Sequence, residues 1–328
     1  MDCVFGIDVG GTNIKLAVID REGQILDHRK IATRANEGPD AVISRLANEL
    51  TSFIQADQGW RIRAVGLAVA GAVDARAGVV MVSPNLTGWR NVPLAERLSE
   101  MTGYQVVVEN DANMAAFGEG WLGVGRTFQS FLVMTLGTGI GGGLILDGWV
   151  WSGPFGCAGE IGHITVDPEG WLCNCGNTGC LETIASATGV VRMASELLAQ
   201  GGSPVLENLI NENGDRLTAE IIATAAFKGD ALANQVFQRV GRVLGLTAVN
   251  LYNLLGLEMI AFSGGMAGAF DLFIGPMREE IKRRSHILPP ENLKLLKGIL
   301  GDDAGTLGAA RIAWSHIELG ERLGSRVN

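Results

Sequence analysis

Two short glycine-rich segments, each lying between two apolar runs, constrain the fold of this chain more than any other feature of its sequence. The first is Gly10-Gly11-Thr12-Asn13, between residues 4–9 and 14–20, and the second is Gly137-Thr138-Gly139, between residues 131–136 and 140–146. A glycine turn between two apolar runs predicts a β-hairpin. Because each turn leads into a strand rather than a helix, a dinucleotide-binding fingerprint is excluded. Neither segment ends in Gly-Lys-Ser/Thr, so a Walker A loop is excluded as well.

The chemistry of these glycine segments has two interpretations. Backbone N–H groups of a glycine turn can point at a phosphate, with the Thr12 hydroxyl as a further donor, and Asp8 at the strand end can hold Mg²⁺ through water. Alternatively, each segment is a hairpin turn that merely needs glycines with positive φ. The occurrence of the same arrangement twice favours two loops that bind one polyphosphate.

The order of the remaining patterns indicates an α/β protein with a mixed sheet. Apolar residues at helical spacing, for example Val42, Leu46 and Leu50, predict helices that alternate with apolar strands. We expect helices at residues 39–55, 92–101 and 304–317, strands at 24–33, 62–70, 105–109 and 257–263, and mostly helix over 183–255 with a loop at 200–204. A chain of 328 residues has room for two such lobes, with a ligand cleft between them.

The net charge and the number of cysteines limit the classes of binding partner and the cellular compartment that we expect for this chain. The 35 acidic and 26 basic residues give a net charge of −9, which argues against nucleic acid or an anionic membrane as a partner. No segment approaches 18 uninterrupted apolar residues, and the start of the chain lacks the pattern of a signal peptide. The five cysteines do not suggest a disulfide framework, and Cys3 and Cys157 are expected to be buried. We therefore expect a cytoplasmic protein.

A polar pair follows the strand expected at residues 105–109. Asn110 and Asp111 stand directly before a helical run. On one interpretation, Asp111 is simply the N-cap of that helix. On the other, its carboxylate lies at the carboxyl end of a strand and is stabilised as the anion by the helix dipole. There the pair can bind a hydroxyl group and accept its proton.

One histidine and three closely spaced cysteines form the most specific pattern in the chain. The set is His163, Cys173, Cys175 and Cys180. These residues supply the four ligands of a closed tetrahedral zinc site, and the glycines at 176 and 179 let the chain curl around the ion. The alternative is that the three thiols and the histidine are simply buried in the core. Three cysteines in a polar, glycine-containing loop are hard to bury, so this alternative is disfavoured. Because all four positions are filled, the zinc is expected to be structural.

Three turn segments are ambiguous by themselves. Gly71 and Asn85 lie in turns between expected strands, where they either shape the turn or line a cleft. Ser263-Gly264-Gly265 ends a strand and precedes a helix. There the backbone can approach a flat ring or a ribose closely, or the glycines serve only a tight connection.

Together these segments resemble the ROK family of sugar kinases and repressors. The motifs that carry the resemblance are DVGGTNIKLAVID, ENDANMAAFGE, TLGTGIGGGLI, GEIGH and CNCGNTGCLETIASATG, spread between Val4 and about Ala313. The last motif looks most similar to the bacterial ATP-dependent glucokinases of that family. The resemblance implies a two-lobed, actin-like (ribonuclease H-like) ATPase fold with a central cleft and a structural zinc loop. It implies a small lobe over residues 1–110, completed by a helix at about 304–328, a large lobe over 111–303, and a homodimer or homotetramer.

The resemblance also assigns roles to individual positions. Gly10, Gly11, Thr12 and Asn13 match a first phosphate loop, with Asp8 at its metal-side edge, Gly137, Thr138 and Gly139 match a second phosphate loop, and Gly264 and Gly265 match an adenosine motif. The positions that match sugar-binding residues are Gly71, Asn85, Asn110, Asp111, Glu160, His163 and Glu182. The positions that match zinc ligands are His163, Cys173, Cys175 and Cys180.

The implied activity is the ATP-dependent phosphorylation of glucose in glycolysis. Asp111 would accept the proton of the 6-hydroxyl while Mg²⁺ and the glycine loops hold the triphosphate. An N-acetylmannosamine or N-acetylglucosamine kinase is the alternative, and a non-catalytic, sugar-responsive regulator is a third class. A repressor of this family is expected to carry a helix-turn-helix before the first glycine loop, whereas Asp8 stands eight residues from the start. Met266 departs from the family pattern, in which a smaller residue is frequent.

Overall fold

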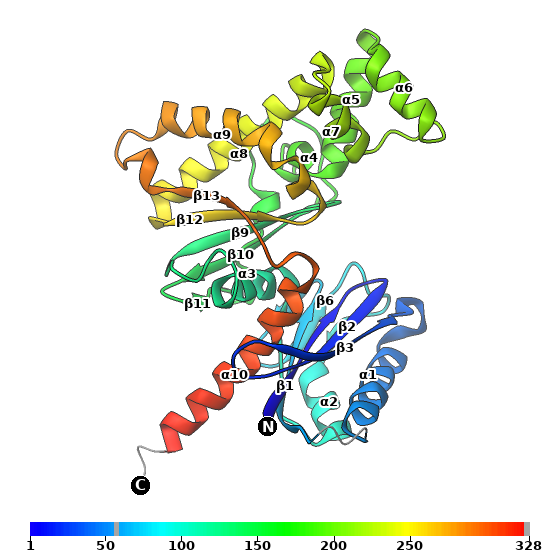
Figure 1. Ribbon diagram of the computed structural model, residues 1–328, viewed down its shortest axis with the longest axis vertical. Coiled ribbons are helices and arrows are strands. Elements are labelled where there is room, and N and C mark those ends of the chain that lie inside the picture. The colour runs from blue at the N-terminus through cyan, green and yellow to red at the C-terminus, as the bar shows by residue number, and fades with distance from the viewer. Residues whose placement is uncertain (56–58, 325–328) are drawn as a thin grey trace. The chain divides into compact units, whose positions relative to one another are not determined.

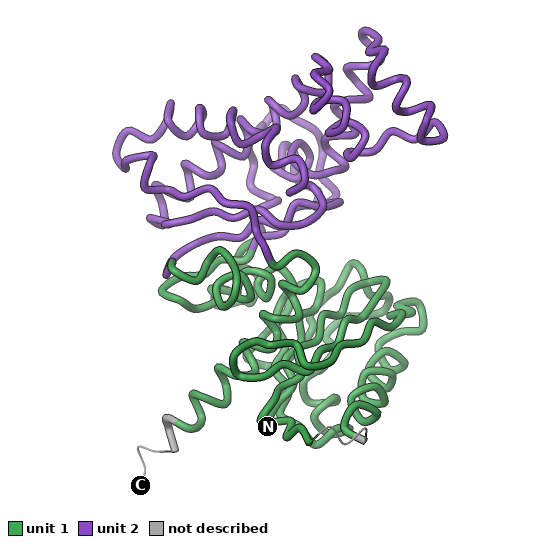
Figure 2. The backbone as a smooth tube through the Cα atoms, in the orientation of Figure 1, with its two compact units in different colours: residues 1–127, 143–159, 300–328 green, residues 128–142, 160–299 purple. Residues whose placement is uncertain are grey.

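The computed structural model describes residues 1–55 and 59–324, which form two compact units (Figure 2). Unit 1 comprises residues 1–127, 143–159 and 300–328, and unit 2 comprises residues 128–142 and 160–299. Residues 111–127 and 143–159 therefore belong to the unit that contains the N-terminus, whereas we expected its boundary at residue 110. Close helix packing explains the difference for residues 111–127. A Cβ at Gly308 would lie 1.7 Å from the carbonyl oxygen of Met114, so the C-terminal helix rests directly on the helix after Asn110.

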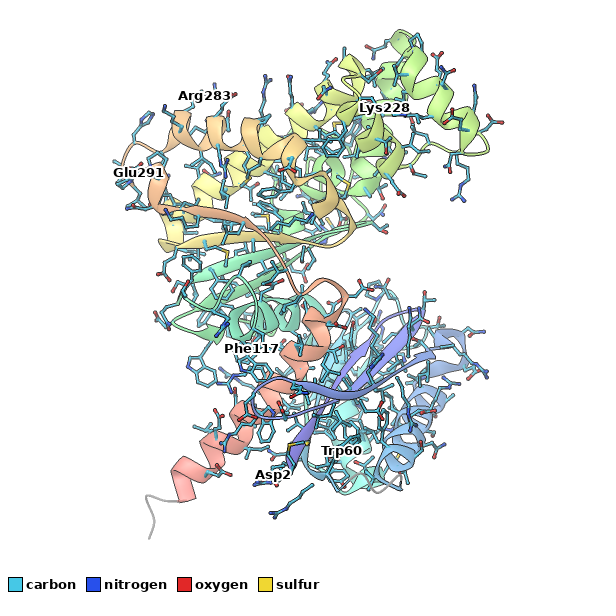
Figure 3. The ribbon with its side chains drawn as sticks, viewed as in Figure 1. Asp2, Trp60, Phe117, Lys228, Arg283 and Glu291 are labelled. Atoms are coloured by element: carbon cyan, nitrogen blue, oxygen red, sulfur yellow. The ribbon has the colours of Figure 1, made fainter. Side chains whose placement is uncertain are left out.

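The sheet of unit 1 is mixed, as the sequence predicts. Its strands are β1 (Asp2–Val9), β2 (Asn13–Ile19), β3 (Ile25–Ala32), β4 (Arg61–Val69) and β8 (Val106–Asn110), in the order β3-β2-β1-β4-β8. Figure 1 labels the first three of these strands. The first three strands pair in antiparallel fashion, and β1, β4 and β8 run parallel. Asp2 and Trp60 mark the end where β1 and β4 begin (Figure 3). The opposite end, where the parallel strands finish, carries the residues predicted to act in chemistry.

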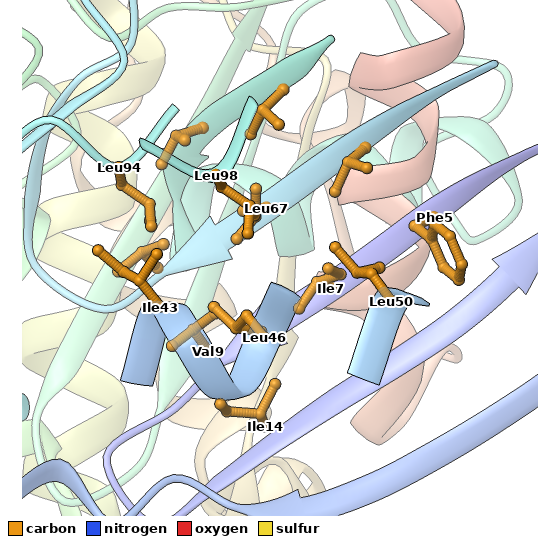
Figure 4. Close-up of a cluster of buried hydrophobic side chains, with 14 of the residues drawn as sticks. Phe5, Ile7, Val9, Ile14, Ile43, Leu46, Leu50, Leu67, Leu94 and Leu98 are labelled. Atoms are coloured by element: carbon orange, nitrogen blue, oxygen red, sulfur yellow. The ribbon is translucent and has the colours of Figure 1, made fainter. Parts of the chain in front are cut away.

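Helices cover both faces of this sheet. On one face lie α1 (Gly38–Gln55) and α2 (Leu94–Thr102), whose apolar residues pack on the strands (Figure 4). The buried side chains labelled there are Phe5, Ile7, Val9, Ile14, Ile43, Leu46, Leu50, Leu67, Leu94 and Leu98. On the other face lies α10 (Ala304–Gly324), which packs with α3 (Asp111–Trp121). A Cβ at Gly66 would lie 1.8 Å from the carbonyl oxygen of Ala309, so glycine permits this contact between helix and sheet.

A small antiparallel sheet in unit 1 was not expected from the sequence. It comprises β5 (Ala72–Asp74), β6 (Val79–Val82) and β7 (Arg90–Val92). The helix that we expected to begin at residue 92 begins at Leu94, and residue 92 belongs to β7 instead. Pro93 explains this boundary, because a proline disfavours helical backbone at the residue before it.

Unit 2 contains most of the second sheet and the remaining α-helices that the structure describes. The sheet order is β11-β10-β9-β12-β13, with β9 (Phe131–Leu136), β10 (Ile140–Leu146), β11 (Trp149–Val150), β12 (Met259–Ser263) and β13 (Lys294–Lys297). The helices are α4 (Glu182–Ala185), α5 (Ala187–Gln200), α6 (Pro204–Glu212), α7 (Ala219–Phe227), α8 (Ala231–Leu255) and α9 (Phe270–Arg284). The chain passes from unit 2 into unit 1 within β10. The loop expected at residues 200–204 separates α5 from α6. No helix in the described ranges is long and apolar enough to cross a membrane.

Candidate active site

Three segments leave the unit 1 sheet at the same edge. Val9 pairs with Val69, and Val69 pairs with Asn110, so β1, β4 and β8 end side by side. The first glycine segment, Gly71 and the Asn110–Asp111 pair follow these three strand ends. The structure therefore brings together residues that lie about 100 positions apart in the sequence, and we call this set of strand ends the sheet edge.

The junction between β8 and α3 is capped by Asn110. Its Oδ1 accepts hydrogen bonds from the backbone N–H groups of Ala112 (2.9 Å) and Asn113 (3.1 Å). Its Nδ2 donates to the carbonyl oxygen of Gly71 (2.9 Å) and to Oδ1 of Asp111 (3.0 Å). The interpretation of Asp111 as the N-cap is therefore wrong, because the neighbouring asparagine performs that task.

Asp111 is the first residue of α3 and is half-buried. Burial raises the pKa of its carboxyl group, whereas hydrogen bonds from backbone N–H groups and from the Asn110 amide lower it. The hydrogen bonds from Ala112 and Asn110 both end on Oδ1. No other residue of the described ranges donates a hydrogen bond to Oδ2, so this oxygen can act as a proton acceptor. A desolvated carboxylate with one oxygen held and the other available has the chemistry of a general base.

Glu109 supports this junction, and our sequence reasoning missed it. Its side chain is 2% exposed, and its Oε1 accepts from the backbone N–H of Asn110 (2.8 Å) and from Nδ2 of Asn113 (3.1 Å). Burial raises the pKa of this carboxyl group. The signal was present, because an acid in an apolar run is seldom fully buried without a partner.

Asp8 lies at the end of β1 and is electrostatically coupled to Asp111. The pKa of the Asp8 carboxyl group is raised to about 6, chiefly by burial; Lys15 lowers it, and the charges of Asp111 and Asp302 contribute to the rise. Nζ of Lys15 donates to the carbonyl oxygen of Asp302 (2.8 Å). A Cβ at Gly305 would lie 3.4 Å from the Asp8 carboxylate, so the start of α10 is a close neighbour of Asp8. Lys15 belongs to the same motif as Asp8, whereas Asp302 and Gly305 have no motif in the sequence that links them to it.

The glycines of the first segment are required by space rather than by positive φ. Neither Gly10 nor Gly11 adopts positive φ, so the interpretation as a turn that needs such glycines is wrong. A Cβ at Gly11 would lie 2.8 Å from the carbonyl oxygen of Asn85, which the structure thus brings to this loop. Thr33 holds the loop, since its hydroxyl donates to the carbonyl oxygen of Gly10 (2.6 Å) and its N–H to that of Thr12 (2.9 Å).

Gly71, by contrast, does require its glycine for backbone conformation. Its φ is +125°, and a Cβ there would lie 2.3 Å from the carbonyl oxygen of Val82. The carbonyl oxygen of Gly71 is the acceptor for the Asn110 amide. A residue that looked like turn chemistry alone is therefore part of the network that orients Asn110.

In unit 2, the second glycine segment contacts Glu182. The backbone N–H of Ile140 donates to Oε2 of Glu182 (2.9 Å), and a Cβ at Gly139 would lie 2.2 Å from the same oxygen. The hydroxyl of Thr188 donates to the carbonyl oxygen of Thr138 (2.9 Å). A cavity of about 200 Å³ is lined by this segment, by the start of α5 and by the cysteine-containing loop.

The pair Gly264-Gly265 lies beside the same segment. Gly264 directly follows β12 and has φ +82°, and a Cβ there would lie 2.5 Å from the carbonyl oxygen of Leu136, the residue before Gly137. Gly265 opens a short 3-10 helix (Gly265–Ala269), and a Cβ there would meet no atom within 4 Å. The positive φ of its turn therefore explains the glycine at position 264. At Gly265, by contrast, the space that a side chain would fill is empty in the structure.

The four proposed metal ligands lie together in the loop over residues 163–182, here called the cysteine loop. One ligand atom each from His163, Cys173, Cys175 and Cys180 lies within 4.8 Å of the others. Nδ1 of His163 is 3.7 Å from Sγ of Cys173, and Sγ of Cys175 is 3.7 Å from Sγ of Cys180. Cys175 is exposed, so the alternative of three buried thiols is wrong. Three sulfur atoms and one imidazole nitrogen are a donor set that suits zinc.

Gly179 and Glu160 are close neighbours of other residues in and beside the cysteine loop. Gly179 has φ +74°, and a Cβ there would lie 1.6 Å from the carbonyl oxygen of Asp167. Oε2 of Glu160 is 3.9 Å from Nε2 of His163, so these two predicted sugar-binding residues are neighbours. Cys3 is buried as expected, but Cys157 is exposed and lies between the positive-φ turns at Gly156 and Gly159.

Comparisons with known proteins were made for the whole chain. The model of the "ROK family" matches residues 4–316. A glucokinase of Halalkalibacterium halodurans is 38% identical over 306 residues, which cover 92% of this chain and 92% of the relative. An N-acetylmannosamine kinase of Escherichia coli is 30% identical over 311 residues, covering 95% and 98%. The crystal structure of a ROK family glucokinase from Streptomyces griseus, in complex with glucose and AMPPNP, has a TM-score of 0.77 and 33% identity, covering 95% and 99%.

Proposed function

This chain belongs to the ROK family, and on that premise we propose that it transfers the γ-phosphoryl group of ATP to the 6-hydroxyl of glucose. The observation that carries the proposal is the hydrogen bonding of Asp111: Oδ1 accepts from Ala112 and Asn110, whereas no other described residue donates to Oδ2. The similarity to glucokinases over nearly the full chain supports glucose as the substrate. The proposed setting is the cytoplasm, with a homodimer or homotetramer as the active form.

In the proposed mechanism Asp111 accepts the proton of the sugar hydroxyl as that oxygen attacks the γ-phosphate. Burial raises the pKa of the Asp111 carboxyl group, which strengthens it as a base while the hydrogen bonds to Oδ1 fix its direction. A positioned base contributes about 10²–10⁴-fold to a rate. Asn110 keeps that carboxylate oriented through its amide, which is in turn fixed by the carbonyl oxygen of Gly71.

The sugar and the nucleotide are assigned to separate groups of residues. We assign the sugar hydroxyls to Gly71, Asn85, Asn110, Asp111, Glu160, His163 and Glu182. We assign the nucleotide to Gly10, Gly11, Thr12 and Asn13, to Gly137, Thr138 and Gly139, and to Gly264 and Gly265. Support comes from two close approaches, of Asn85 to Gly11 and of Glu182 to Gly139. Each glycine segment therefore has a residue that we assign to sugar binding beside it. Phosphoryl transfer depends chiefly on such positioning and on charge stabilisation.

Two metal ions complete the proposal. Mg²⁺, when bound, neutralises charge on the transferred phosphoryl group, and the half-buried Asp8 carboxylate beside Lys15 suits its water shell. His163, Cys173, Cys175 and Cys180 would hold a structural Zn²⁺, for which their clustered donor atoms fit. The histidine would then be fixed in orientation by its metal-bound nitrogen, as metal-bound side chains are elsewhere.

A panel of sugars tests the substrate. ADP release is to be measured with glucose, mannose, N-acetylglucosamine and N-acetylmannosamine, and we expect the highest kcat/KM for glucose. The second candidate, an N-acetylmannosamine kinase, is favoured by the 30% identical relative with that name. A higher kcat/KM for an acetylated sugar would replace the proposed substrate, and ADP release stimulated by none of the four sugars would refute a sugar kinase.

A further inference from the structure

A cavity of about 290 Å³ lies in unit 2 and includes none of the residues assigned above to sugar, nucleotide or metal. Its walls are α5, α8 and the indole of Trp171. Its charged and aromatic lining residues are Trp171, Glu196, Arg239 and Arg242. We propose that this cavity is a second binding site, for a small phosphorylated polyhydroxy molecule of the sugar-phosphate class. Its volume is near the lower end of the range for small-molecule sites, about 300–1,000 Å³.

The lining of the cavity holds more arginines than carboxylates, although the chain as a whole is acidic, and the guanidinium left without a paired carboxylate among the described residues is that of Arg242. Arg239 and Arg242 line it together with a single carboxylate, Glu196, in a chain of net charge −9. Arg239 is already oriented, because its guanidinium pairs with Asp167 (3.0 Å) and lies 5.3 Å from the Trp171 ring centroid.

Its neighbour on the next turn of α8, Arg242, is free to bind. Within residues 1–55 and 59–324, no hydrogen bond or ion pair engages the side chain of Arg242. A guanidinium fork matches a phosphate in bidentate geometry. One pre-oriented arginine beside one unengaged arginine is therefore an arrangement suited to a phosphate group.

The remaining walls match hydroxyl groups and the C–H faces of a ring. The side-chain amides of Gln200, Gln235 and Gln238 each offer two donors and an acceptor, which neutral hydroxyls can satisfy in both directions. Met193, Leu197 and Val236 supply apolar surface between them. A bare inorganic anion would leave these amides and this apolar surface unused, so a phosphorylated polyol fits the cavity better.

Trp171 connects this cavity to the cysteine loop. Its ring also lies 5.4 Å from the guanidinium of Arg192, and Arg192 lines the separate cavity beside Thr138 and Gly139. Its carbonyl oxygen accepts the backbone N–H of Gly179 (2.8 Å). Ligand bound against the indole is therefore expected to slow hydrogen exchange over residues 171–180.

Calorimetric titration of the full chain with glucose 6-phosphate tests the site without any need for turnover. The test variant is Arg242→Gln, and the matched control is Arg278→Gln, an exposed arginine on α9 that lines a different cavity. We expect the control to keep the affinity of the wild type and Arg242→Gln to lose at least about tenfold, the size of a charge-assisted hydrogen bond. Protection of residues 171–180 from exchange should be lost in the same variant.

The other probes decide what the cavity recognises. Glucose without a phosphate and inorganic phosphate alone are both expected to bind more weakly than glucose 6-phosphate. The proposal is overturned if Arg242→Gln binds as tightly as the wild type, which would assign the sugar phosphate to another site. It is equally overturned if inorganic phosphate binds as tightly as the sugar phosphate, or if nothing binds below about 10 mM, a free energy near 3 kcal/mol.

Discussion

The sheet edge of unit 1 and the cysteine loop of unit 2 hold their functional side chains by different physical means. At the sheet edge, the side chains of Glu109 and Asn110 accept hydrogen bonds from backbone N–H groups at the start of α3. The strands that carry them belong to a buried apolar core. In the cysteine loop, three thiols and an imidazole gather where turns with positive φ at Gly176 and Gly179 bend the chain. The first arrangement is maintained by the fold itself, whereas the second is expected to depend on a bound ion.

This difference implies that the two regions fail differently. Changes at the sheet edge should alter chemistry or stability whether or not zinc is present. Changes in the cysteine loop should act through the metal and spare the sheet edge. Four predictions follow this division, and they are ordered by the expected size of the effect.

Asp111→Asn is expected to lower kcat by about 10²–10⁴-fold, because it removes the proton acceptor but keeps Oδ1 as an acceptor for the Ala112 N–H. The matched control is Asp271→Asn, an acid in the first turn of α9. Steady-state kinetics and thermal unfolding of both variants check the prediction. A kcat within tenfold of the wild type would remove Asp111 from the role of base.

Asp8 is expected to make the metal-free protein less stable as the pH rises from about 4 to 6. Its pKa in the folded chain is about 6, above the ordinary 3.8, so the folded state binds more protons than the unfolded state in this window. The contribution of Asp8 to stability is therefore greatest below the unfolded pKa, and about 2–3 kcal/mol of it is lost once the pH passes the folded pKa. Urea unfolding of wild type and Asp8→Asn between pH 4 and 7 measures this, and equal slopes for the two proteins would refute it.

Glu109→Met is expected to destabilise the protein by about 1–3 kcal/mol, because the N–H of Asn110 and the amide of Asn113 lose their shared acceptor. It should also lower kcat in the folded protein, since Asn110 orients Asp111. Glu109→Gln keeps an acceptor oxygen and is the control, with a smaller effect on both. If kcat of folded Glu109→Met equals that of the wild type, Glu109 is structural only.

Cys175→Ser is expected to remove zinc and to raise KM for glucose by about 10–100-fold, the usual effect of losing support for a bound histidine. The unfolding of unit 1 should change little. Cys157→Ser alters an exposed cysteine outside the set and serves as the control. Zinc content by elemental analysis accompanies the kinetics, and wild-type protein that contains no zinc would contradict the assignment of the metal.

The sequence predicted those features that repeat over many residues. The strands 4–9 and 14–20 and the helix 39–55 were found because their apolar periodicity is long. The sheet of β5, β6 and β7 was missed because strands of three and four residues carry too little pattern. The segment around α6 matched no motif, although Ser203 caps this helix and Pro204 begins it.

In the candidate site, too, the sequence predicted features that depend on adjacent residues and missed those that depend on residues far apart in the chain. The sequence predicted that Asn110 and Asp111 act as a pair. It could not predict which of the two caps α3, because that depends on hydrogen bonds formed only in the folded chain. The need for glycine at position 11 arises from Asn85, 74 positions away, and therefore has no local signal. Asp302 and Gly305 reach Asp8 only because α10 packs on the sheet.

Identification of the product tests the central claim most directly. The protein is to be incubated with glucose, ATP and Mg²⁺, and the phosphorylated sugar is to be assigned by phosphorus–proton NMR, with Asp111→Asn run in parallel. The account predicts glucose 6-phosphate as the product of the wild type and its near absence in the variant. Phosphate at another hydroxyl, or ADP release without any sugar phosphate, would contradict it.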